Sequence, residues 1–214
     1  MKSFELMIFD LDGTLVDSAS DLIAAVNYTR GVLGLTPMGA KEIIAFVGDG
    51  TDKLVERFVG PELQQRRAEA LDVFLAYYEA HLLDHTALYP GVVEMLELLR
   101  DRKKIIITNK RYQLARQLTD GLGITGYFTE LIGMGSTPFR KPDARIMLPL
   151  LERDGLAPAK VIIFGDGVTD IGLAKNAGAK SCALLNGFTS RETLLALDPD
   201  YFCETIGEIP ALFC

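Results

Sequence analysis

Short runs of apolar residues recur along the chain, and most are separated by segments with the amphipathic spacing of helices. Uninterrupted runs of Ile, Leu, Val and Phe are typical of parallel strands that are buried on both faces. We expect five such strands, at residues 6–9, 104–108, 128–133, 161–164 and 181–185. The intervening patterns predict helices at 92–100, 111–121, 143–153 and 169–177, followed by a short helical end. This alternation predicts an α/β fold with a doubly wound parallel sheet.

The stretch from residue 16 to residue 85 departs from this alternation. Its apolar positions recur at helical spacing, and no segment has the pattern of a convincing strand. The turn signal Tyr89-Pro90-Gly91 marks the return of strand and helix alternation. The chain is therefore predicted to form an α/β core from residues 1–15 and 86–214 with a helical insertion at 16–85. Within the insertion we expect helices near 18–33, 40–46, 51–58 and 61–83.

Two aspartates follow the first predicted strand, at the point where it gives way to a loop. They are Asp10 and Asp12, in the segment Asp10-Leu11-Asp12-Gly13-Thr14. In open α/β sheets, ligands bind at this end of the strands. Two carboxylates so close together need a cation, a proton or hydrogen bonds to compensate their charge. Gly13 would allow a sharp turn close to a ligand, and Thr14 could fix that turn.

Three further polar clusters come later in the chain. Thr108-Asn109-Lys110 follows the second predicted strand, and Gly165-Asp166-Gly167-Val168-Thr169-Asp170 follows the fourth. Between them, Lys141-Pro142 follows a loop rich in Gly, Ser, Thr and Pro. Each cluster alone is common in proteins, but the four together in this order resemble the motifs of the haloacid dehalogenase superfamily of aspartate-nucleophile phosphatases. The resemblance extends over essentially the whole chain.

The resemblance implies a Rossmann-like core with a helical cap between the first and second motifs, which agrees with the predicted insertion. It also implies hydrolysis of a phosphate monoester, a reaction class in which enzymes reach accelerations of about 10²¹. In this chemistry Asp10 would attack phosphorus in line and form an aspartyl-phosphate. Asp12 would protonate the leaving group and then accept a proton from water.

A hard cation would allow a phosphate dianion to approach an anionic aspartate. Mg²⁺ prefers oxygen ligands, and we expect Asp10, the backbone carbonyl of Asp12 and Asp166 to bind it. Asp170, one helical turn after Asp166, is expected to orient water or Lys141.

The phosphate itself needs cationic and hydrogen-bonding partners. We expect Thr108, Asn109 and Lys141 to hold its oxygens, with Lys141 as the point charge. Gly167 stands where the superfamily often has Ser or Thr, which removes a hydroxyl but keeps the metal-binding acid.

Composition favours a cytoplasmic enzyme with a small-molecule substrate. The 214 residues, of which 49% are hydrophobic, can bury a sizeable core, and no apolar segment approaches the length of a membrane span. Met1-Lys2-Ser3 leads directly into the first strand, so no signal peptide is expected. A net charge of −7 argues against nucleic acid as a partner. We expect a monomer or a homodimer.

The three cysteines, Cys182, Cys203 and Cys214, form no C-x-x-C motif. Their small, odd number indicates a reducing compartment rather than a disulfide framework. Cys214 is the last residue, which is the wrong position for a prenylation motif.

Two other patterns suggest chemistry that their context does not support. The segment 121–126 matches G-x-G-x-x-G, but it ends a predicted helix instead of following a strand, so we expect a helix end and a turn. His81 and His85 have metal-ligand spacing near the end of the long predicted helix. Because Leu82 replaces the Glu of H-E-x-x-H, we expect these histidines to stabilise the helix end.

The loop before the third helix of the insertion could contact the substrate or form a solvent-facing turn, and the charges near it could equally be surface charges. Backbone N–H groups at the helix start could hold an anion, and the residues that we consider are Gly48, Asp49, Gly50, Lys53 and Arg57, with Lys41 nearby. The wider pattern resembles the phosphoglycolate phosphatase branch, in the stretches 10–18, 46–56, 89–92 and 108–110. This resemblance implies 2-phosphoglycolate or a similar small phosphorylated metabolite as substrate.

Three alternatives to this function stay open. A sugar phosphomutase or an inorganic pyrophosphatase would use the same fold and motifs. A non-enzymatic binding or regulatory protein is disfavoured because it has no physical need for so many clustered acids. In the enzymatic case we expect the cap to open and close on hinges near Leu15–Asp17 and His85–Leu88.

Overall fold

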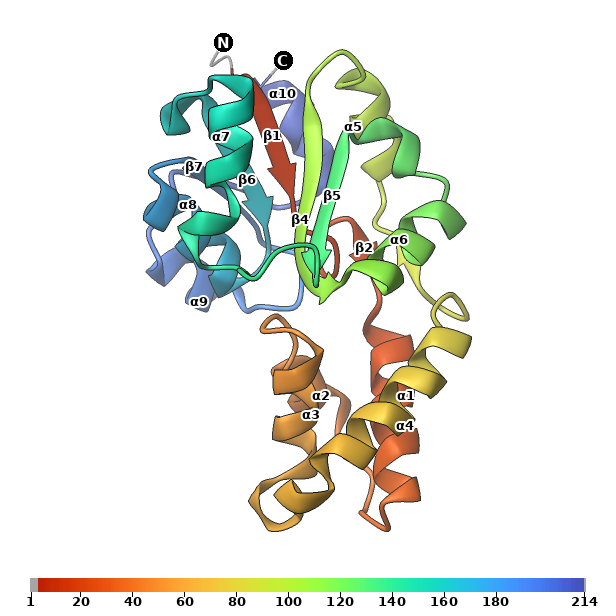
Figure 1. The fold of residues 1–214 in the computed structure, drawn as a ribbon. Coiled ribbons are helices and arrows are strands. Elements are labelled where there is room, and N and C mark those ends of the chain that lie inside the picture. Colours follow the sequence, from red (N-terminus) through yellow and green to blue (C-terminus); the bar gives the residue numbers. More distant parts are fainter. Residues whose placement is uncertain (1–3, 214) are drawn as a thin grey trace.

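The computed structural model describes residues 4–213 and places six strands in one sheet (Figure 1). All neighbouring strands run parallel, and the chain builds outward from β1, first to one side and then to the other. The predicted α/β fold with a doubly wound parallel sheet is therefore confirmed. In spatial order the strands are β5 (Glu130–Met134), β4 (Lys104–Arg111), β1 (Leu6–Phe9), β6 (Val161–Gly165), β7 (Lys180–Leu184) and β8 (Tyr201–Cys203).

The central strand β1 is buried on both faces, as its apolar sequence requires. Alternate side chains point to opposite faces of a strand. Leu6 and Ile8 belong to the core on the side of α7 (Leu148–Asp154) and α8 (Val168–Ala177). Met7 and Phe9 belong to the opposite core, which also contains α5 (Val92–Leu98), α6 (Tyr112–Gly121) and α10 (Ile209–Phe213). The remaining core helix is α9 (Arg191–Ala196).

A separate group of helices lies beyond the carboxyl ends of the strands (Figure 1). Helix α1 packs against α4, and α3 also packs against α4. Two short chain segments connect this group to the sheet, and there β2 (Val16–Asp17) pairs antiparallel with β3 (Ala87–Leu88). The helices of the group are α1 (Ala19–Val32), α2 (Ala40–Ile44), α3 (Thr51–Val59) and α4 (Arg67–Ala80), with a 3-10 turn at Pro61–Arg66.

The buried carboxylate of Asp21, near the start of α1, fastens this connection. It accepts hydrogen bonds from the backbone N–H groups of His85 and Thr86, at 3.0 and 2.8 Å, and from the Thr86 hydroxyl at 2.7 Å. These donors outweigh the effect of burial and lower the pKa of Asp21. Both chain segments of the connection are thus tied to one side chain.

The structure corrects three local predictions. The predicted helix 61–83 is instead the 3-10 turn that starts at Pro61, followed by α4, which ends at Ala80. The antiparallel pair β2–β3 was not expected, because strands of two residues carry no periodic signal. Strand β8 was not expected either, because its three residues lie at the sheet edge with Phe202 half exposed. Elsewhere the predicted strands and helices are present, with ends that differ by a few residues.

Within residues 4–213, no helix has both the length and the apolar character needed to span a membrane. The expectations for Met1-Lys2-Ser3 and for Cys214 concern residues outside the described range.

Candidate active site

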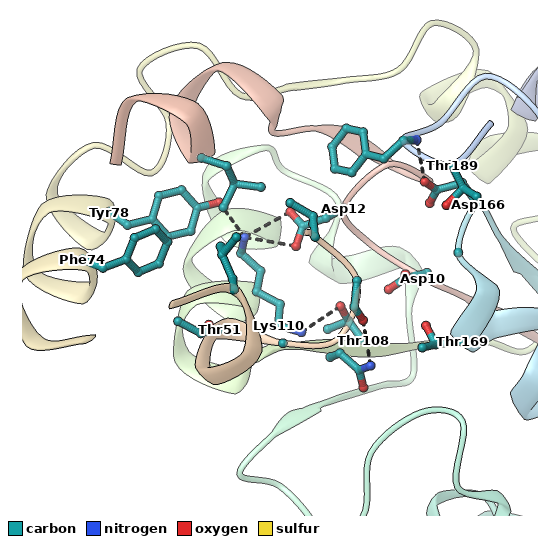
Figure 2. Close-up of a pocket in the computed structure, with 18 residues that line it drawn as sticks. Asp10, Asp12, Thr51, Phe74, Tyr78, Thr108, Lys110, Asp166, Thr169 and Thr189 are labelled. Carbon is teal, nitrogen blue, oxygen red and sulfur yellow. Dashed lines mark hydrogen bonds and ion pairs between the residues drawn. The ribbon is translucent and has the colours of Figure 1, made fainter. Parts of the chain in front are cut away.

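The carboxyl ends of three neighbouring strands bring the predicted motifs together. Phe9 lies beside Ile106 in β4 and Phe164 in β6, so the residues that come next in each of these three segments meet at one edge of the sheet. Thr108, Asn109 and Lys110 are still part of β4, which extends further than the predicted strand 104–108. A pocket opens there, between the sheet and helices α1, α3 and α4 (Figure 2). Its core side contains Asp10, Asp12, Thr108, Asn109, Lys110, Asp166, Gly167, Thr169, Phe188 and Thr189.

Asp10 is held at the centre of this edge by two donors. The backbone N–H of Leu11 donates to Asp10 Oδ1 at 2.7 Å, and Lys141 Nζ lies 2.7 Å from the same oxygen. Both of these contacts fall on Oδ1. The second carboxylate oxygen is thereby left as the one that can act as nucleophile or ligand.

Asp166 is buried at the edge of the pocket, and its carboxylate is held by donors from two other segments. The Thr14 hydroxyl donates to Oδ1 at 2.7 Å and the Phe188 N–H donates to Oδ2 at 2.7 Å. Gly13, at φ +81°, passes so close that an added Cβ would lie 2.2 Å from an Asp166 oxygen. Burial and the nearby Asp10 charge raise the pKa of Asp166 to about 7, although these donors oppose the rise.

One lysine faces several acids at this edge. Lys141 Nζ contacts Asp170 Oδ1 at 2.6 Å as well as Asp10, and its side chain is only 1% exposed. Burial alone would lower the pKa of Lys141, but the two carboxylates raise it overall. Burial and Asp10 raise the pKa of Asp170. Oxygen atoms of Asp10, Asp166 and Asp170 all lie within 4.8 Å of one another, so together they could hold a metal ion.

Asn109 connects the core motifs to the loop between α2 and α3, in the helical group. Its side-chain oxygen accepts from the Lys141 N–H at 3.0 Å, while its Nδ2 donates to the Lys141 carbonyl at 3.1 Å and to the Gly48 carbonyl at 2.9 Å. Both N–H groups of the amide are therefore engaged. Thr108 lines the pocket, and its Oγ1 accepts from the Lys110 N–H at 3.2 Å.

Asp12 lies apart from the other acids and has its own partners. The Ser18 hydroxyl donates to Oδ1 at 2.6 Å, and Lys110 Nζ donates to Oδ1 and Oδ2 at 3.0 and 3.2 Å (Figure 2). Lys110 also donates to the Tyr78 hydroxyl of α4 at 2.7 Å. The acid expected to act as general acid and base is thus linked to the cap.

The residues expected to select the substrate separate into three groups. Gly48 and Gly50 line the pocket beside Asp10. Asp49 and Arg57 pair with each other and line an adjoining cavity of about 690 Å³, together with Lys41. Lys53 instead pairs with Glu56 at 3.0 Å.

The other two sequence patterns have structural roles. Segment 121–126 begins at the last residue of α6, and Gly123 adopts φ +72° just beyond it, which confirms a helix end. Both histidines lie after α4, which ends at Ala80, so the expected helical spacing was wrong. His81 contacts Asp84 at 2.7 Å and His85 contacts Asp21 at 2.9 Å.

No functional role for Lys110 or Tyr78 is predicted by the sequence pattern. Lys110 was noticed only as the last residue of a motif, and Tyr78 lies in an apolar stripe that suggested core packing. One signal for Lys110 was available: two-residue periodicity places it on the same side of β4 as Thr108. For Tyr78 the sequence carried no comparable signal, because its partner is 32 residues away.

Comparisons with known proteins find similar sequences along most of the chain. The model of the haloacid dehalogenase-like hydrolase family matches residues 7–184. A phosphoglycolate phosphatase of Chromobacterium violaceum is 37% identical over 98% of this chain and 96% of its own. One from Vibrio cholerae is 34% identical over 98% of this chain and 96% of its own.

Solved structures show the same fold. A crystal structure from Haemophilus somnus, described as a predicted phosphoglycolate phosphatase, superposes with a TM-score of 0.94 at 28% identity and covers 99% of both chains. A haloacid dehalogenase-like hydrolase from Streptococcus pneumoniae superposes with a TM-score of 0.90 at 31% identity and covers all of both chains.

Proposed function

The chain belongs to the haloacid dehalogenase-like hydrolase family, and we propose that it is a Mg²⁺-dependent phosphatase whose preferred substrate is 2-phosphoglycolate or a similar small phosphate ester. The observation that carries the proposal is the meeting of Asp10, Lys141 and Asp166 at one edge of the sheet. The names of relatives that match nearly the whole chain support the substrate class.

Asp10 is proposed as the nucleophile. One of its carboxylate oxygens is fixed by Leu11 and Lys141, which holds the other in a set direction for in-line attack. The attack would form an aspartyl-phosphate, which water then hydrolyses. Asp12 would protonate the leaving alkoxide in the first step and accept a proton from water in the second.

Thr108 and Lys141 are proposed to hold the phosphate, whereas the expected direct role of Asn109 is corrected, because both N–H groups of its amide are already engaged. Lys141 supplies the charge, and Asp170 keeps its ammonium group directed at Asp10. Asn109 contributes by fixing the Lys141 backbone, since it accepts from the Lys141 N–H and donates to the Lys141 carbonyl. The phosphate would then lie between Thr108 and Asp10, both of which line the pocket.

The residues present fit a bound Mg²⁺. The candidate donors are carboxylate oxygens, which are the ligands that this cation prefers. Burial and the neighbouring Asp10 raise the pKa of Asp166, so a bound cation would favour its charged form. Asp10, the Asp12 backbone carbonyl and Asp166 would hold the ion, which when bound neutralises charge on the phosphate.

The helical group, within residues 16–85, is proposed to be a mobile cap over the site. A closed cap would exclude water, and an open cap would admit substrate. The cavity beside Asp10 has a volume of about 60 Å³, and one water needs roughly 10–15 Å³ by this measure. Such a space favours small substrates. The hinges would lie at Leu15–Asp17 and His85–Leu88, where β2 pairs with β3.

Phosphate release from a panel of substrates tests the proposal. The panel contains 2-phosphoglycolate, sugar phosphates, nucleotides, pyrophosphate and p-nitrophenyl phosphate, each with Mg²⁺ and with EDTA. We expect a metal-dependent rate that is highest with 2-phosphoglycolate. A metal-dependent rate centred on another ester would refute the substrate, and no release from any member would refute the phosphatase.

A further inference from the structure

A buried line of three side chains runs from the cap helix α4 to Asp12. The Tyr78 hydroxyl accepts a hydrogen bond from Lys110 Nζ at 2.7 Å, and the same ammonium donates to both Asp12 oxygens (Figure 2). The Lys110 side chain is 4% exposed and the Asp12 side chain 14% exposed. The contact therefore joins two parts of the chain through a site with little water.

Lys110 has no spare hydrogen-bonding capacity in this arrangement. An ammonium group has three N–H donors, and the two Asp12 oxygens and the Tyr78 hydroxyl provide three acceptors. Burial would lower the pKa of Lys110, but Asp12 and Tyr78 raise it overall. Burial raises the pKa of Tyr78 to about 12. The line thus consists of a neutral phenol, an ammonium ion and a carboxyl group.

The Tyr78 hydroxyl is not required by the packing around it. The ring lies against Phe74, with centroids 5.4 Å apart, and both residues belong to the apolar core. Phe74 and Tyr78 are the α4 residues that line the pocket, and only Tyr78 carries a polar group. A phenylalanine would fill the same space. The hydroxyl therefore matters for what it contacts, which is Lys110.

We propose that Lys110 and Tyr78 are positioning residues for Asp12. Lys110 holds the Asp12 side chain, and Tyr78 holds Lys110 from the cap, so that Asp12 is correctly placed only while α4 lies against the core. This inference rests on the proposed function, because it takes Asp12 as the general acid and base. It adds a means by which cap position controls that residue.

The test compares substrates that differ in their need for a general acid. An alkyl phosphate releases a strongly basic alkoxide and needs protonation, whereas 2,4-dinitrophenyl phosphate releases a weakly basic phenolate and does not. The variants are Tyr78→Phe, Lys110→Met and the control Tyr77→Phe, which changes the adjacent α4 tyrosine that stacks on Tyr28 and His81. The measured quantity is the single-turnover rate of leaving-group release with enzyme in excess.

General acid catalysis contributes about 10²–10⁴-fold, so partial misplacement of Asp12 should cost about 10-fold in Tyr78→Phe and about 100-fold in Lys110→Met with the alkyl phosphate. The rate with 2,4-dinitrophenyl phosphate should stay within about threefold of wild type. Tyr77→Phe should leave both rates unchanged. Equal slowing of both substrates, or no slowing of either, would overturn the proposal.

The double variant Tyr78→Phe/Lys110→Met shows whether Tyr78 acts through Lys110. If it does, the tyrosine substitution has no further effect once the lysine is gone, so the two losses are not additive. Additive losses would overturn the link. If Lys110→Met does not fold, the proposal is tested by comparing the rates of Tyr78→Phe and the control Tyr77→Phe with the two substrates. A wild-type enzyme that hydrolyses neither substrate would refute the proposed function instead.

Discussion

The two walls of the pocket differ in chemistry. The wall formed by the core carries acids, a lysine and hydroxyl groups, and Lys110 there contacts Asp12. The wall formed by the cap is largely apolar and comprises Leu22, Val47, Gly48, Gly50, Thr51, Leu54, Phe74 and Tyr78. A polar wall with fixed charges suits the reaction, and an apolar wall suits exclusion of water.

The two walls also differ in how they are held. The core residues follow strands of one sheet, whose register fixes their relative positions. The cap helices are joined to the core by two chain segments, which pair over two residues each as β2 and β3. Near this pair, the Asp21 carboxylate of α1 accepts hydrogen bonds from the N–H groups of His85 and Thr86. We infer that substitutions in the core wall change the chemical step, whereas those in the cap wall change selection or placement.

The substitution with the largest expected effect is Asp10→Asn. Loss of the nucleophile should lower kcat by about 10⁴-fold or more, as loss of a nucleophile does in other enzymes. The variant should fold, because asparagine keeps the size of the side chain and Lys141 keeps Asp170 as a partner. Phosphate release and thermal unfolding measure the two effects. Retained activity in a folded variant would refute the assignment of the nucleophile.

The contrast between the walls explains what the sequence could predict. Asp10 and Asp166 follow strand ends directly, and Thr108 follows the apolar run Ile105–Ile107 within β4, so the apolar run before each residue located it. Parallel strands bring such ends together whatever the loops do. The sheet and the meeting of these residues were therefore predictable from local pattern and order.

The cap wall was not predictable in the same way. Gly48 and Gly50, in the loop before α3, were expected near the substrate and do line the pocket. The other cap residues lie mostly on helices whose apolar positions also form the core, so Leu54 and Tyr78 could not be told apart from packing residues. The sequence also did not show which charged residues of the cap pair with one another. Lys53 and Arg57 looked available to a substrate, but each has an acidic partner, Glu56 and Asp49. Whether a charged side chain is available to a substrate depends on its contacts with other side chains, which the sequence pattern does not reveal.

A volume-conserving change in the cap wall should have a moderate effect. Leu54→Met keeps the apolar surface but changes its shape, at a stability cost below about 1.5 kcal/mol. We expect the ratio of kcat/KM between a small and a larger phosphate ester to shift a few-fold, since one methylene contributes about 0.8 kcal/mol. Leu63→Met, outside the pocket lining, is the control. An equal loss for every ester would show that Leu54 does not select.

The smallest expected effect is a change in the pH dependence of stability. It compares Asp166, in the candidate site, with Asp21, which lies where the cap joins the core. Burial and Asp10 raise the pKa of Asp166 to about 7. A folded protein that binds this proton more tightly than the unfolded chain is stabilised at low pH. The metal-free protein should therefore lose stability as the pH rises from about 4 through about 7, by a few degrees in Tm. Asp166→Asn should reduce this loss.

Asp21 should act with the opposite sign, because its donors lower its pKa. A carboxylate that is favoured in the folded state contributes stability above its unfolded pKa, near 4, and that contribution is lost as the pH falls. Asp21→Asn should lower Tm most at neutral pH and least in acid, whereas Asp166→Asn should raise it most at neutral pH. Thermal unfolding in EDTA between pH 3 and pH 8 measures both. If the Tm of the two variants changed with pH in the same way, burial alone would set the pKa values of Asp21 and Asp166, and their different neighbours would have no effect.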